Sequence, residues 1–405
     1  MEEWKTYKLG DLCNIHRGAS PRPIQKFLSD KGQPWVKISD ATSDSSRFIS
    51  TTKEFIIEDG IKHSVIVTPG TLIVSNSATP GLPKIMKIEA CVHDGWLIID
   101  QIRDCVLKEY LYYSFINIRR NLSNQANGSV FQNLKTEIVK NFEIKIPSLS
   151  KQRLIVDVLS SIEDKIDLNN RINHNLEEQA QALYKSWFVD FEPFQEGEFV
   201  ESELGLIPKG WKVVSLDSLC SIISRGFSPK YSESTTDVVL GQRCVRNNMI
   251  DLSVSKTHVP KNLGERALCQ YDILINSTGM GSLGRVAQIY FKPERMTYDS
   301  HLTLVRAKSS TLEMYLGRNL LSRQDEIENM AVGSTGQTEL PRDSVKAMSI
   351  LLPCDTVLDQ FGALIRAIAG RIQSNLEENV GLTAMRDYLL PKLMSGELKI
   401  NDLDC

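Results

Sequence analysis

The sequence predicts an α+β protein made of two similar halves. Two mixed α/β domains are separated by two long helices, which form an antiparallel coiled coil about a pseudo-twofold axis. One observation behind this prediction is an internal repeat: residues 171–178 read RINHNLEE and residues 371–378 read RIQSNLEE, identical at six of eight positions. Self-similarity at a fixed period indicates duplicated architecture. The other observation is an abrupt change, at the end of each half, from short β-type runs to a long stretch with helical spacing.

The duplication extends along the whole chain. Further matches occur in the same order in both halves, at an offset between 200 and 208 residues. They include Trp4 and Trp211, Gly18 and Gly226, Asp94 and Asp299, Gln132 and Gln337, and Pro147 and Pro353. Insertions in loops explain the drifting offset, whereas chance would produce isolated matches rather than a colinear series.

The two predicted α/β domains are residues 1–148 and 210–353. Both contain short runs of β-branched and aromatic residues broken by Gly, Pro, Asn and Ser, which is typical of strands joined by loops. Strands are predicted at 35–38, 64–68, 71–74, 237–240, 273–275, 285–290 and 302–305, and a helix at 110–122.

A long helix follows each domain. After Pro147, Ser150 is the expected N-cap, and apolar residues then recur mostly every fourth position. They are Leu154, Val158, Ile162, Ile166, Ile172, Leu176, Leu183 and Trp187. This pattern predicts a first long helix over residues 149–191, roughly 60 Å long at ~1.5 Å per residue.

The second long helix and a C-terminal segment occupy residues 354–397, with Asp355 as the cap and with Gly381 and Pro391 interrupting the helix. An acidic linker spans residues 192–209. One long helix cannot bury its apolar stripe by itself, so the two helices are expected to pair. The alternative is that each helix packs on its own domain.

Composition points to a cytoplasmic protein with reduced thiols. The chain is 41% hydrophobic and 24% charged, and no apolar run approaches the ~20 residues that span a bilayer. The first residues, MEEWK, do not resemble a secretion signal. The 8 cysteines form no CxxC pair, and the 6 histidines show no metal-ligand spacing. We therefore expect no membrane segment, no disulfide framework and no bound metal.

Charge is distributed unevenly, although the net charge is only −3. Residues 1–148 carry 19 Lys and Arg against 16 Asp and Glu, and residues 208–352 carry 18 against 14. Residues 149–207 carry 5 against 12, and residues 353–405 carry 5 against 8. Two mildly basic lobes that alternate with acidic segments fit lobes that contact phosphate groups.

Catalytic motifs are missing from the sequence. It contains no GxxxxGK[ST], no GxSxG, no HExxH and no [ND]PPY motif of amino-methyltransferases. Residues 279–284 fit GxGxxG, but a predicted strand follows them where a dinucleotide site needs a helix, so a glycine turn is predicted. We expect no catalytic residue and no cofactor.

The remaining candidates are basic and amide residues in glycine-marked loops of both domains. Arg suits guanine edges, Gln suits adenine edges, and every cation suits phosphate. Taken singly, each of these residues is expected to be an ordinary surface residue. Their occurrence at equivalent places in two domains is what indicates DNA binding. The predicted DNA-binding residues are Arg17, Arg22, Lys37, Gln132, Arg225, Lys230, Arg243, Arg246, Arg285 and Gln337.

The motif ALYKSWFVDF at 182–191 closes the first long helix, and YLLPKLMSGE at 388–397 closes the second. Through these motifs, and through the openings and ends of the two domains, the chain resembles type I restriction-modification DNA specificity subunits along essentially its whole length. The resemblance implies that the domains are target-recognition domains 1 and 2, each reading one half of a split, asymmetric DNA site. The domains differ at residues 78–84 and 278–285, which is expected if they read different bases.

The resemblance also implies the partners. These are double-stranded DNA and two modification subunits, which use S-adenosylmethionine to methylate adenine; two restriction subunits, which cleave DNA with ATP, can join. In such systems the specificity subunit is not an enzyme, and its long helices set the distance between the half-sites and bind the modification subunits. The repeated octet offers the same surface twice. The predicted partner-binding residues are therefore Arg171, Glu177, Glu178, Arg371, Glu377 and Glu378.

Two other functions remain open at this point. The chain could be an enzyme, such as a nuclease or a self-sufficient methyltransferase, but the missing motifs count against that. It could instead be an assembly scaffold of a defence complex with little DNA readout of its own, but the two basic lobes count against that.

Overall fold

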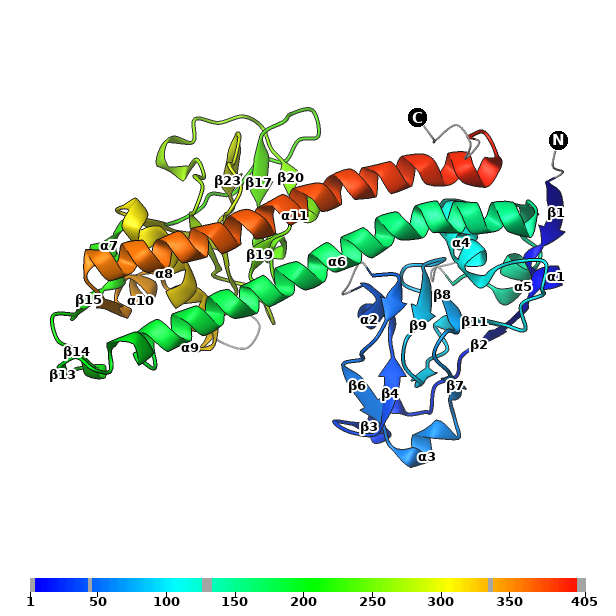
Figure 1. The fold of residues 1–405 in the computed structure, drawn as a ribbon, viewed down its shortest axis with the longest axis horizontal. Coiled ribbons are helices and arrows are strands. Elements are labelled where there is room, and N and C mark those ends of the chain that lie inside the picture. Colours follow the sequence, from blue (N-terminus) through cyan, green and yellow to red (C-terminus); the bar gives the residue numbers. More distant parts are fainter. Residues whose placement is uncertain (1–3, 43–45, 126–132, 334–337, 399–405) are drawn as a thin grey trace. The chain divides into compact units, whose positions relative to one another are not determined.

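A computed structural model describes residues 4–42, 46–125, 133–333 and 338–398. The chain divides into two compact units: unit 1 comprises Met1–Asn169 and Glu378–Cys405, and unit 2 comprises Asn170–Glu377. Both boundaries fall inside long helices, α6 (Leu149–Phe188) and α11 (Asp355–Ser395), so each unit contains a segment of both (Figure 1). The predicted combination of mixed α/β structure with two long helices is confirmed.

The described residues of unit 1 form two five-stranded sheets and one strand pair. The first sheet has the order β2 (Asn14–Arg17), β11 (Trp96–Asp100), β8 (Leu72–Ser75), β9 (Pro83–Met86) and β5 (Phe48–Ile49). The second has the order β3 (Leu28–Ser29), β6 (Glu54–Ile56), β4 (Gln33–Val36), β10 (Ala90–Val92) and β7 (Val65–Val67). β1 (Lys5–Lys8) pairs antiparallel with β12 (Glu143–Ile146), which directly precedes α6.

The central strands of the first sheet of unit 1 are buried on both faces. Successive side chains of a strand point to opposite faces. Along β8, Leu72 and Val74 pack with helix α4 (Lys108–Gln125), whereas Ile73 packs with residues of the second sheet. The strand is therefore a continuous apolar run rather than an alternating one.

Unit 2 has smaller sheets built in the same way. Its main sheet has the order β16 (Cys220–Arg225), β24 (Leu302–Ala307), β21 (Ile273–Asn276) and β22 (Val286–Gln288). A second sheet has the order β20 (Lys256–Thr257), β17 (Val238–Leu240) and β23 (Met296–Tyr298), and β18 (Val245–Arg246) pairs with β19 (Met249–Ile250). Along β21, Ile273 and Ile275 pack with helix α8 (Ser310–Ser322), and Leu274 packs on the opposite face.

Several strand pairings recur in the two units. β4 and β10 are parallel in unit 1, as are β17 and β23 in unit 2. The pairing of β1 with β12 is repeated by β15 (Lys212–Ser215) with β25 (Ser349–Leu352), the strand before α11. The short helices are α1 (Leu9–Leu12), α2 (Ile38–Thr42), α3 (Glu58–Ile61), α5 (Thr136–Lys140), α7 (Leu216–Leu219), α9 (Gln324–Asn329) and α10 (Arg342–Lys346).

The local predictions hold for most of the predicted elements. The predicted strands other than 35–38 overlap β7, β8, β17, β21, β22 and β24, and α4 contains the predicted helix at 110–122. The run 35–38 is divided, because β4 ends at Val36 and α2 begins at Ile38. The turn with the GxGxxG pattern connects β21 to β22, so the predicted glycine turn is confirmed.

Three predictions about the long helices were wrong. α6 begins at Leu149 and α11 at Asp355, so Ser150 and Asp355 lie in the first turns rather than at the caps. α11 is not interrupted: it continues through Gly381 and Pro391. Pro391 lies in the last turns, where it removes only one backbone hydrogen bond, and its buried neighbours Leu390 and Leu393 hold this end in the core of unit 1.

The predicted linker also carries regular structure. It contains a short 3-10 helix (Glu192–Phe194) and the hairpin of β13 (Phe199–Ser202) with β14 (Gly205–Pro208). Phe194 packs edge-on against Trp211, with 5.0 Å between ring centroids. Aromatic contacts thus fold a segment whose acidic composition indicated a linker.

The buried stripe of α6 lies one residue further along the helix than predicted at its start. Ile155 and Leu159 are fully buried, whereas Leu154 is 47% exposed. Ile162 and Ile166 are buried as predicted. Adjacent residues differ by about 100° around a helix axis, so either of two neighbouring apolar residues can start a stripe.

Within unit 1, α6 and α11 run antiparallel. The carboxylate of Glu163 lies 3.4 Å from the guanidinium of Arg386, and the amide of Asn169 donates to the carboxylate of Glu378 over 2.8 Å. The later residue of α6 thus meets the earlier residue of α11. Tyr113 of α4 also donates to Glu163 over 3.0 Å, so this buried carboxylate joins three helices.

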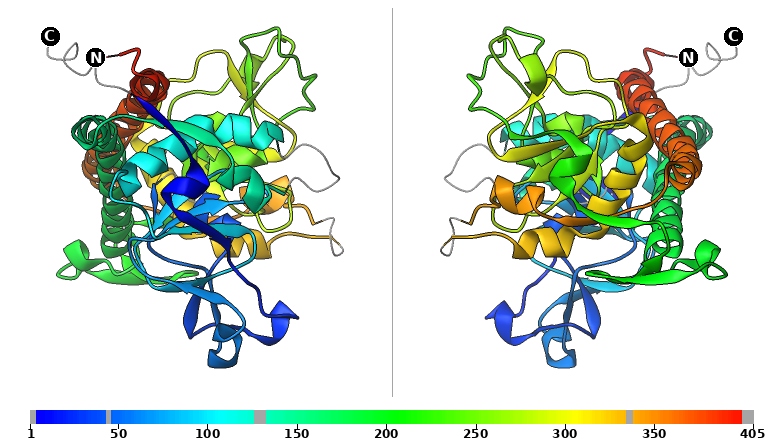
Figure 2. Two further views of the ribbon diagram at one scale, coloured as in Figure 1. Left: turned by 90° about the vertical axis from the view of Figure 1, so that its right-hand side faces the viewer. Right: turned by 90° about the vertical axis from the view of Figure 1, so that its left-hand side faces the viewer.

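Within unit 2, the two helix segments are antiparallel as well (Figures 1 and 2). Asn375 donates to the side chain of Asn173 over 2.8 Å, and both are buried. Phe188 packs edge-on against Phe361, with 4.8 Å between ring centroids. The repeated octets therefore meet at a buried polar contact.

Arg318 attaches α6 to α8 in unit 2. Its side chain is 1% exposed and forms an ion pair with Glu177, which is 18% exposed. It also donates to the hydroxyl of Tyr290. Removing one partner of a buried ion pair strongly destabilises a protein, because the other charge stays buried and unpaired.

We expect Arg318→Leu to lower the free energy of unfolding of unit 2 on the order of 3 kcal/mol, as measured by urea denaturation. The double variant Arg318→Leu with Glu177→Leu should recover most of that loss, since it removes both charges. Equal destabilisation by the single and double variants would show that the charge pair is not the cause.

Candidate nucleic-acid interface

In unit 1, Asp94 organises the candidate cations at the end of β2. The guanidinium of Arg17 donates to the backbone carbonyl of Asp94 over 2.9 Å, and that of Arg22 to its carboxylate over 3.1 Å. Ser20 donates to the same carboxylate over 2.7 Å. The side chain of Arg22 remains 82% exposed, so it is positioned and still accessible to an anion.

The ionisation of Asp94 reflects this cluster. Burial raises the pKa of Asp94, but the hydroxyl of Ser20, a backbone N–H, the neighbouring His93 and the guanidinium of Arg22 together lower it by more. Asp94 is therefore ionised at neutral pH and compensates part of the charge of Arg22.

A close backbone contact explains the repeated Arg-Gly pairs. A Cβ atom on Gly18 would lie 2.3 Å from the carbonyl oxygen of His93, and one on Gly226 would lie 2.2 Å from that of Asp299. No other residue fits at such a distance. The glycines bring the end of the β2 or β16 strand against the loop that carries the aspartate, in the same way in both units.

The equivalent cluster of unit 2 has different chemistry. Arg225 donates to the backbone carbonyls of Ser300 and Leu340 and forms an ion pair with Glu339 at 2.9 Å. With 22% of its side chain exposed, Arg225 mainly ties loops together. Burial raises the pKa of Asp299, which accepts the backbone N–H of His301 over 2.9 Å.

Other predicted DNA-binding residues are placed as follows. Lys37 is half-buried and forms an ion pair with Glu54. Lys230, Arg243 and Arg246 are exposed, and Arg285 is exposed with its guanidinium on the carbonyl of Gly281 at 2.7 Å. Gln132 and Gln337 lie outside the described residues.

The structure brings together a polar group in unit 2 that the sequence prediction did not include. Gln242, next to Arg243, accepts the hydroxyl of Thr278 over 3.4 Å through its side chain. The side chain of Thr278 lies 2.7 Å from the ring of His301. Gln242, Thr278 and His301 thus form a connected set of hydrogen-bonding side chains, and Arg243 is next to it in the sequence.

Two buried asparagines anchor the loops that carry these groups. Asn76 follows β8 and donates to the carbonyl of Asp94 over 3.1 Å, while Asn276 ends β21 and donates to the carbonyl of Gln242 over 3.1 Å. Both are fully buried. The sequence held a signal for them, because Asn76-Ser77 is repeated as Asn276-Ser277 at an offset of 200.

The candidate partner-binding residues lie on the long helices and are mostly exposed. Arg171, Arg371 and Glu377 are exposed, and Glu178 is exposed beside His174. Glu177 is bound to Arg318, and Glu378 lies 3.2 Å from Lys165. Glu177 thus holds its own unit together, and the role of the others in partner binding stays a prediction.

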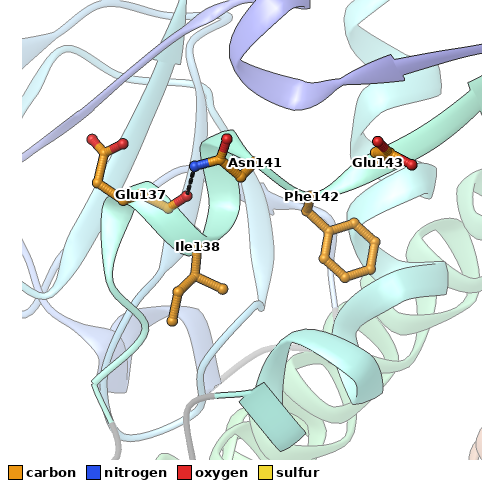
Figure 3. Close-up of a pocket in the computed structure, with 5 residues that line it drawn as sticks. All are labelled: Glu137, Ile138, Asn141, Phe142 and Glu143. Carbon is orange, nitrogen blue, oxygen red and sulfur yellow. Dashed lines mark hydrogen bonds between the residues drawn. The ribbon is translucent and has the colours of Figure 1, made fainter.

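A hollow beside α5 contains none of the candidate residues. It is lined by Glu137, Ile138, Asn141, Phe142 and Glu143 (Figure 3). Asn141 closes the short helix by donating to the carbonyl of Glu137 over 2.9 Å. The two glutamates lie at opposite ends of the hollow, which makes it a poor match for phosphate.

Among the described residues, no group of three or more His, Cys, Asp or Glu side chains could hold a metal ion. Among the same residues, no helix is both long and apolar enough to cross a membrane.

Comparison with known proteins gives one consistent family. Residues 1–178 match the family described as "Type I restriction modification DNA specificity domain". The chain is 28% identical to the type I restriction enzyme MjaIX specificity subunit of Methanocaldococcus jannaschii, over 99% of this chain and 95% of that protein. It is 22% identical to the HindI specificity subunit of Haemophilus influenzae, over 98% and 100%.

A solved structure has a similar fold. The crystal structure of the S subunit of a type I restriction-modification system from M. genitalium superposes with a TM-score of 0.56. The match covers 97% of this chain and 96% of that one at 15% identity.

Arg243 is the candidate best placed to read a base, because it is exposed beside the network of Gln242. We expect Arg243→Ala to lower affinity for the target duplex by about 1–3 kcal/mol and to relax discrimination at one base pair. Fluorescence titration against target and single-substituted duplexes measures both effects.

Lys209→Ala, in the segment after β14, serves as the control, since it removes an exposed cation outside the cluster. A phosphate contact by Arg243 would give a different result. Binding would weaken equally for all sequences, and the dependence on salt would become shallower.

Proposed function

We propose that this chain, which belongs to the family of type I restriction-modification DNA specificity subunits, is the subunit that reads a bipartite, asymmetric DNA site. It directs adenine methylation and DNA cleavage by partner subunits and carries no catalytic site of its own. The observation that carries the proposal is a shared scaffold with different side chains. The glycine contacts of Gly18 and Gly226 recur, but the polar groups around them differ.

Residues 1–148 and 210–353 are the two target-recognition domains in this proposal. Each opens with a strand that pairs with the strand before a long helix, β1 with β12 and β15 with β25. These closed units support an origin by internal duplication. They also support independent reading of the two half-sites, because each carries its own basic and amide side chains.

The spacer in this proposal is an antiparallel coiled coil formed by residues 149–191 and 354–397. The contact of Arg386 with the buried Glu163 and the buried contact between Asn173 and Asn375 support it. Exposed charges at Arg171 and Arg371 leave equivalent surfaces for two modification subunits. Two restriction subunits complete the complex, which acts on DNA in the cytoplasm.

Exchanging one domain tests the proposal. Residues 208–352 are replaced by the matching domain of a relative, and the methylated motif is determined by methylome sequencing of cells that also express the modification subunits. One half of the motif is expected to change and the other to stay the same, since each domain reads one half.

An exchange of residues 1–148 is the matched control and should change the other half. A motif that changes in both halves at once would contradict independent domains. A methylation pattern unaffected by either exchange would favour the alternative function, an assembly scaffold with little DNA readout of its own.

Helix length is expected to set the unread gap between the half-sites. Four helix-forming residues are inserted after Asn169 in α6 and four after Glu377 in α11, where the chain passes between the units. Each insertion adds about 6 Å of helix, and at about 3.4 Å per base pair the gap should grow by one or two pairs. Methylome sequencing measures the gap directly.

An insertion of two residues instead of four provides the control, because it changes the direction in which the buried stripe faces. Four residues nearly complete a helical turn and keep the buried stripe aligned, whereas two residues rotate it by about 200° and should prevent assembly. A four-residue variant that assembles and methylates with an unchanged gap would show that the helices do not measure the distance.

A further inference from the structure

Met280 is an unusual side chain at the apex of the turn between β21 and β22. It is 89% exposed, more than any other large hydrophobic side chain among the described residues. A single exposed apolar residue is normal on a surface. The position of Met280 is unusual, because its turn is held by several hydrogen bonds and is surrounded by groups that can bind DNA.

Backbone hydrogen bonds fix the turn. The N–H of Leu283 donates to the carbonyl of Gly279 over 2.9 Å, and the N–H of Gly284 donates to that of Asn276 over 2.9 Å. The side chain of Leu283 is buried, which anchors the turn from below.

Glycines make this conformation possible. Gly279 and Gly281 have φ values of 105° and 72°, which other residues rarely adopt. A Cβ on Gly279 would lie 2.4 Å from the side-chain oxygen of Gln242, and one on Gly284 would lie 2.8 Å from Glu328. Met280 thus lies on a turn whose conformation is fixed by its glycines and their close contacts.

Hydrogen-bonding groups lie on the same turn and beside it. Arg285 closes the turn on the carbonyl of Gly281 and remains exposed, while Thr278 at the other end contacts Gln242 and His301. An apolar apex between such groups matches the edges of base pairs in the major groove. The 5-methyl group of thymine is the apolar feature of those edges.

We propose that Met280 is a specificity-determining residue that packs against the 5-methyl group of a thymine in the half-site read by unit 2. The inference rests on the proposed function. If an adenine is methylated in each half-site, each half-site contains an A·T pair and therefore a thymine. The unbranched, polarizable side chain of Met suits a contact with a small methyl group.

The corresponding turn of unit 1 lacks this feature. It connects β8 to β9 and is shorter; its exposed residue is Ala78, while Pro80 and Gly81 are buried. Ser123 of α4 donates to the carbonyl of Pro80 over 3.2 Å and covers the turn. The methyl contact is therefore confined to one half-site.

Deoxyuridine substitution tests the contact, because it removes the methyl group and leaves base pairing intact. The full complex with its modification subunits is assayed for initial methylation rates on duplexes in which each thymine of one half-site is replaced in turn. The half-site of unit 2 is identified beforehand by the domain exchange. Wild type is compared with Met280→Gln, which keeps the length, and with Met280→Leu, which keeps the apolar character.

For wild type, one substitution is expected to lower kcat/KM about fourfold, the loss that corresponds to one buried methyl-sized group. Met280→Gln should methylate the thymine and deoxyuridine duplexes equally, and Met280→Leu should keep a preference for thymine. Leu252→Gln, a change at another exposed apolar residue of unit 2, should leave the wild-type preference intact.

Three results would overturn the inference: a half-site of unit 2 without thymine, a wild type indifferent to every substitution, or a Met280→Gln variant that retains the preference. If Met280→Gln lowers kcat/KM by the same factor on every duplex, and so retains the preference, Met280 acts in unstacking of bases or in a protein contact instead. A normal bipartite motif together with any of these results leaves the proposed function intact. If the domain exchange does not change the motif, the proposed function itself fails.

Discussion

The structure depends on the need of two very long helices to bury one face along their length. Helix α6 has 40 residues and α11 has 41, and most of the stability of helices in proteins comes from the packing of an amphipathic face rather than from intrinsic propensity. Apolar residues supply most of the burial, but Asn169, Asn173 and Asn375 occupy the same buried face. The Asn173–Asn375 contact is satisfied only in one register. A shift along the helices would leave buried amides without partners, which is costly, so the polar contact fixes the pairing that the apolar residues stabilise.

The candidate interface combines a backbone arrangement shared by the two units, here called the frame, with side chains that differ between them. Gly18 and Gly226 allow a backbone approach that no side chain could tolerate, and Asn76 and Asn276 fasten the adjoining loops. The two glycines leave no room for a side chain. The side chains around the two glycines do differ. The carboxylate of Asp94 in unit 1 holds the accessible Arg22, whereas that of Asp299 in unit 2 accepts the backbone N–H of His301. A frame fixed by close packing can thus present different chemistry without refolding.

The long helices, six of the seven predicted strands and the glycine turn agree with the structure, because each depends on local periodicity and on residues with restricted conformations. The sequence could not decide between Leu154 and Ile155 as the start of the buried stripe, since both are apolar and only the partner surface distinguishes them. It could not reveal that Glu177 is paired with Arg318, a residue 141 positions away. Sequence alone predicts that a glutamate in a charged helix is solvent-exposed, because its distant partner is not known.

The same limit explains the candidate cations. Sequence alone gives Arg22 and Arg225 equal weight, because both lie in or close to a repeated Arg-Gly pair. Their surroundings separate them: the side chain of Arg22 is 82% exposed and that of Arg225 is 22% exposed. An arginine whose donors already serve backbone carbonyls has few left for a base or a phosphate. Readout in unit 2 therefore depends on side chains next to the frame, such as Arg243 and Met280, rather than on the arginine that the duplication singles out.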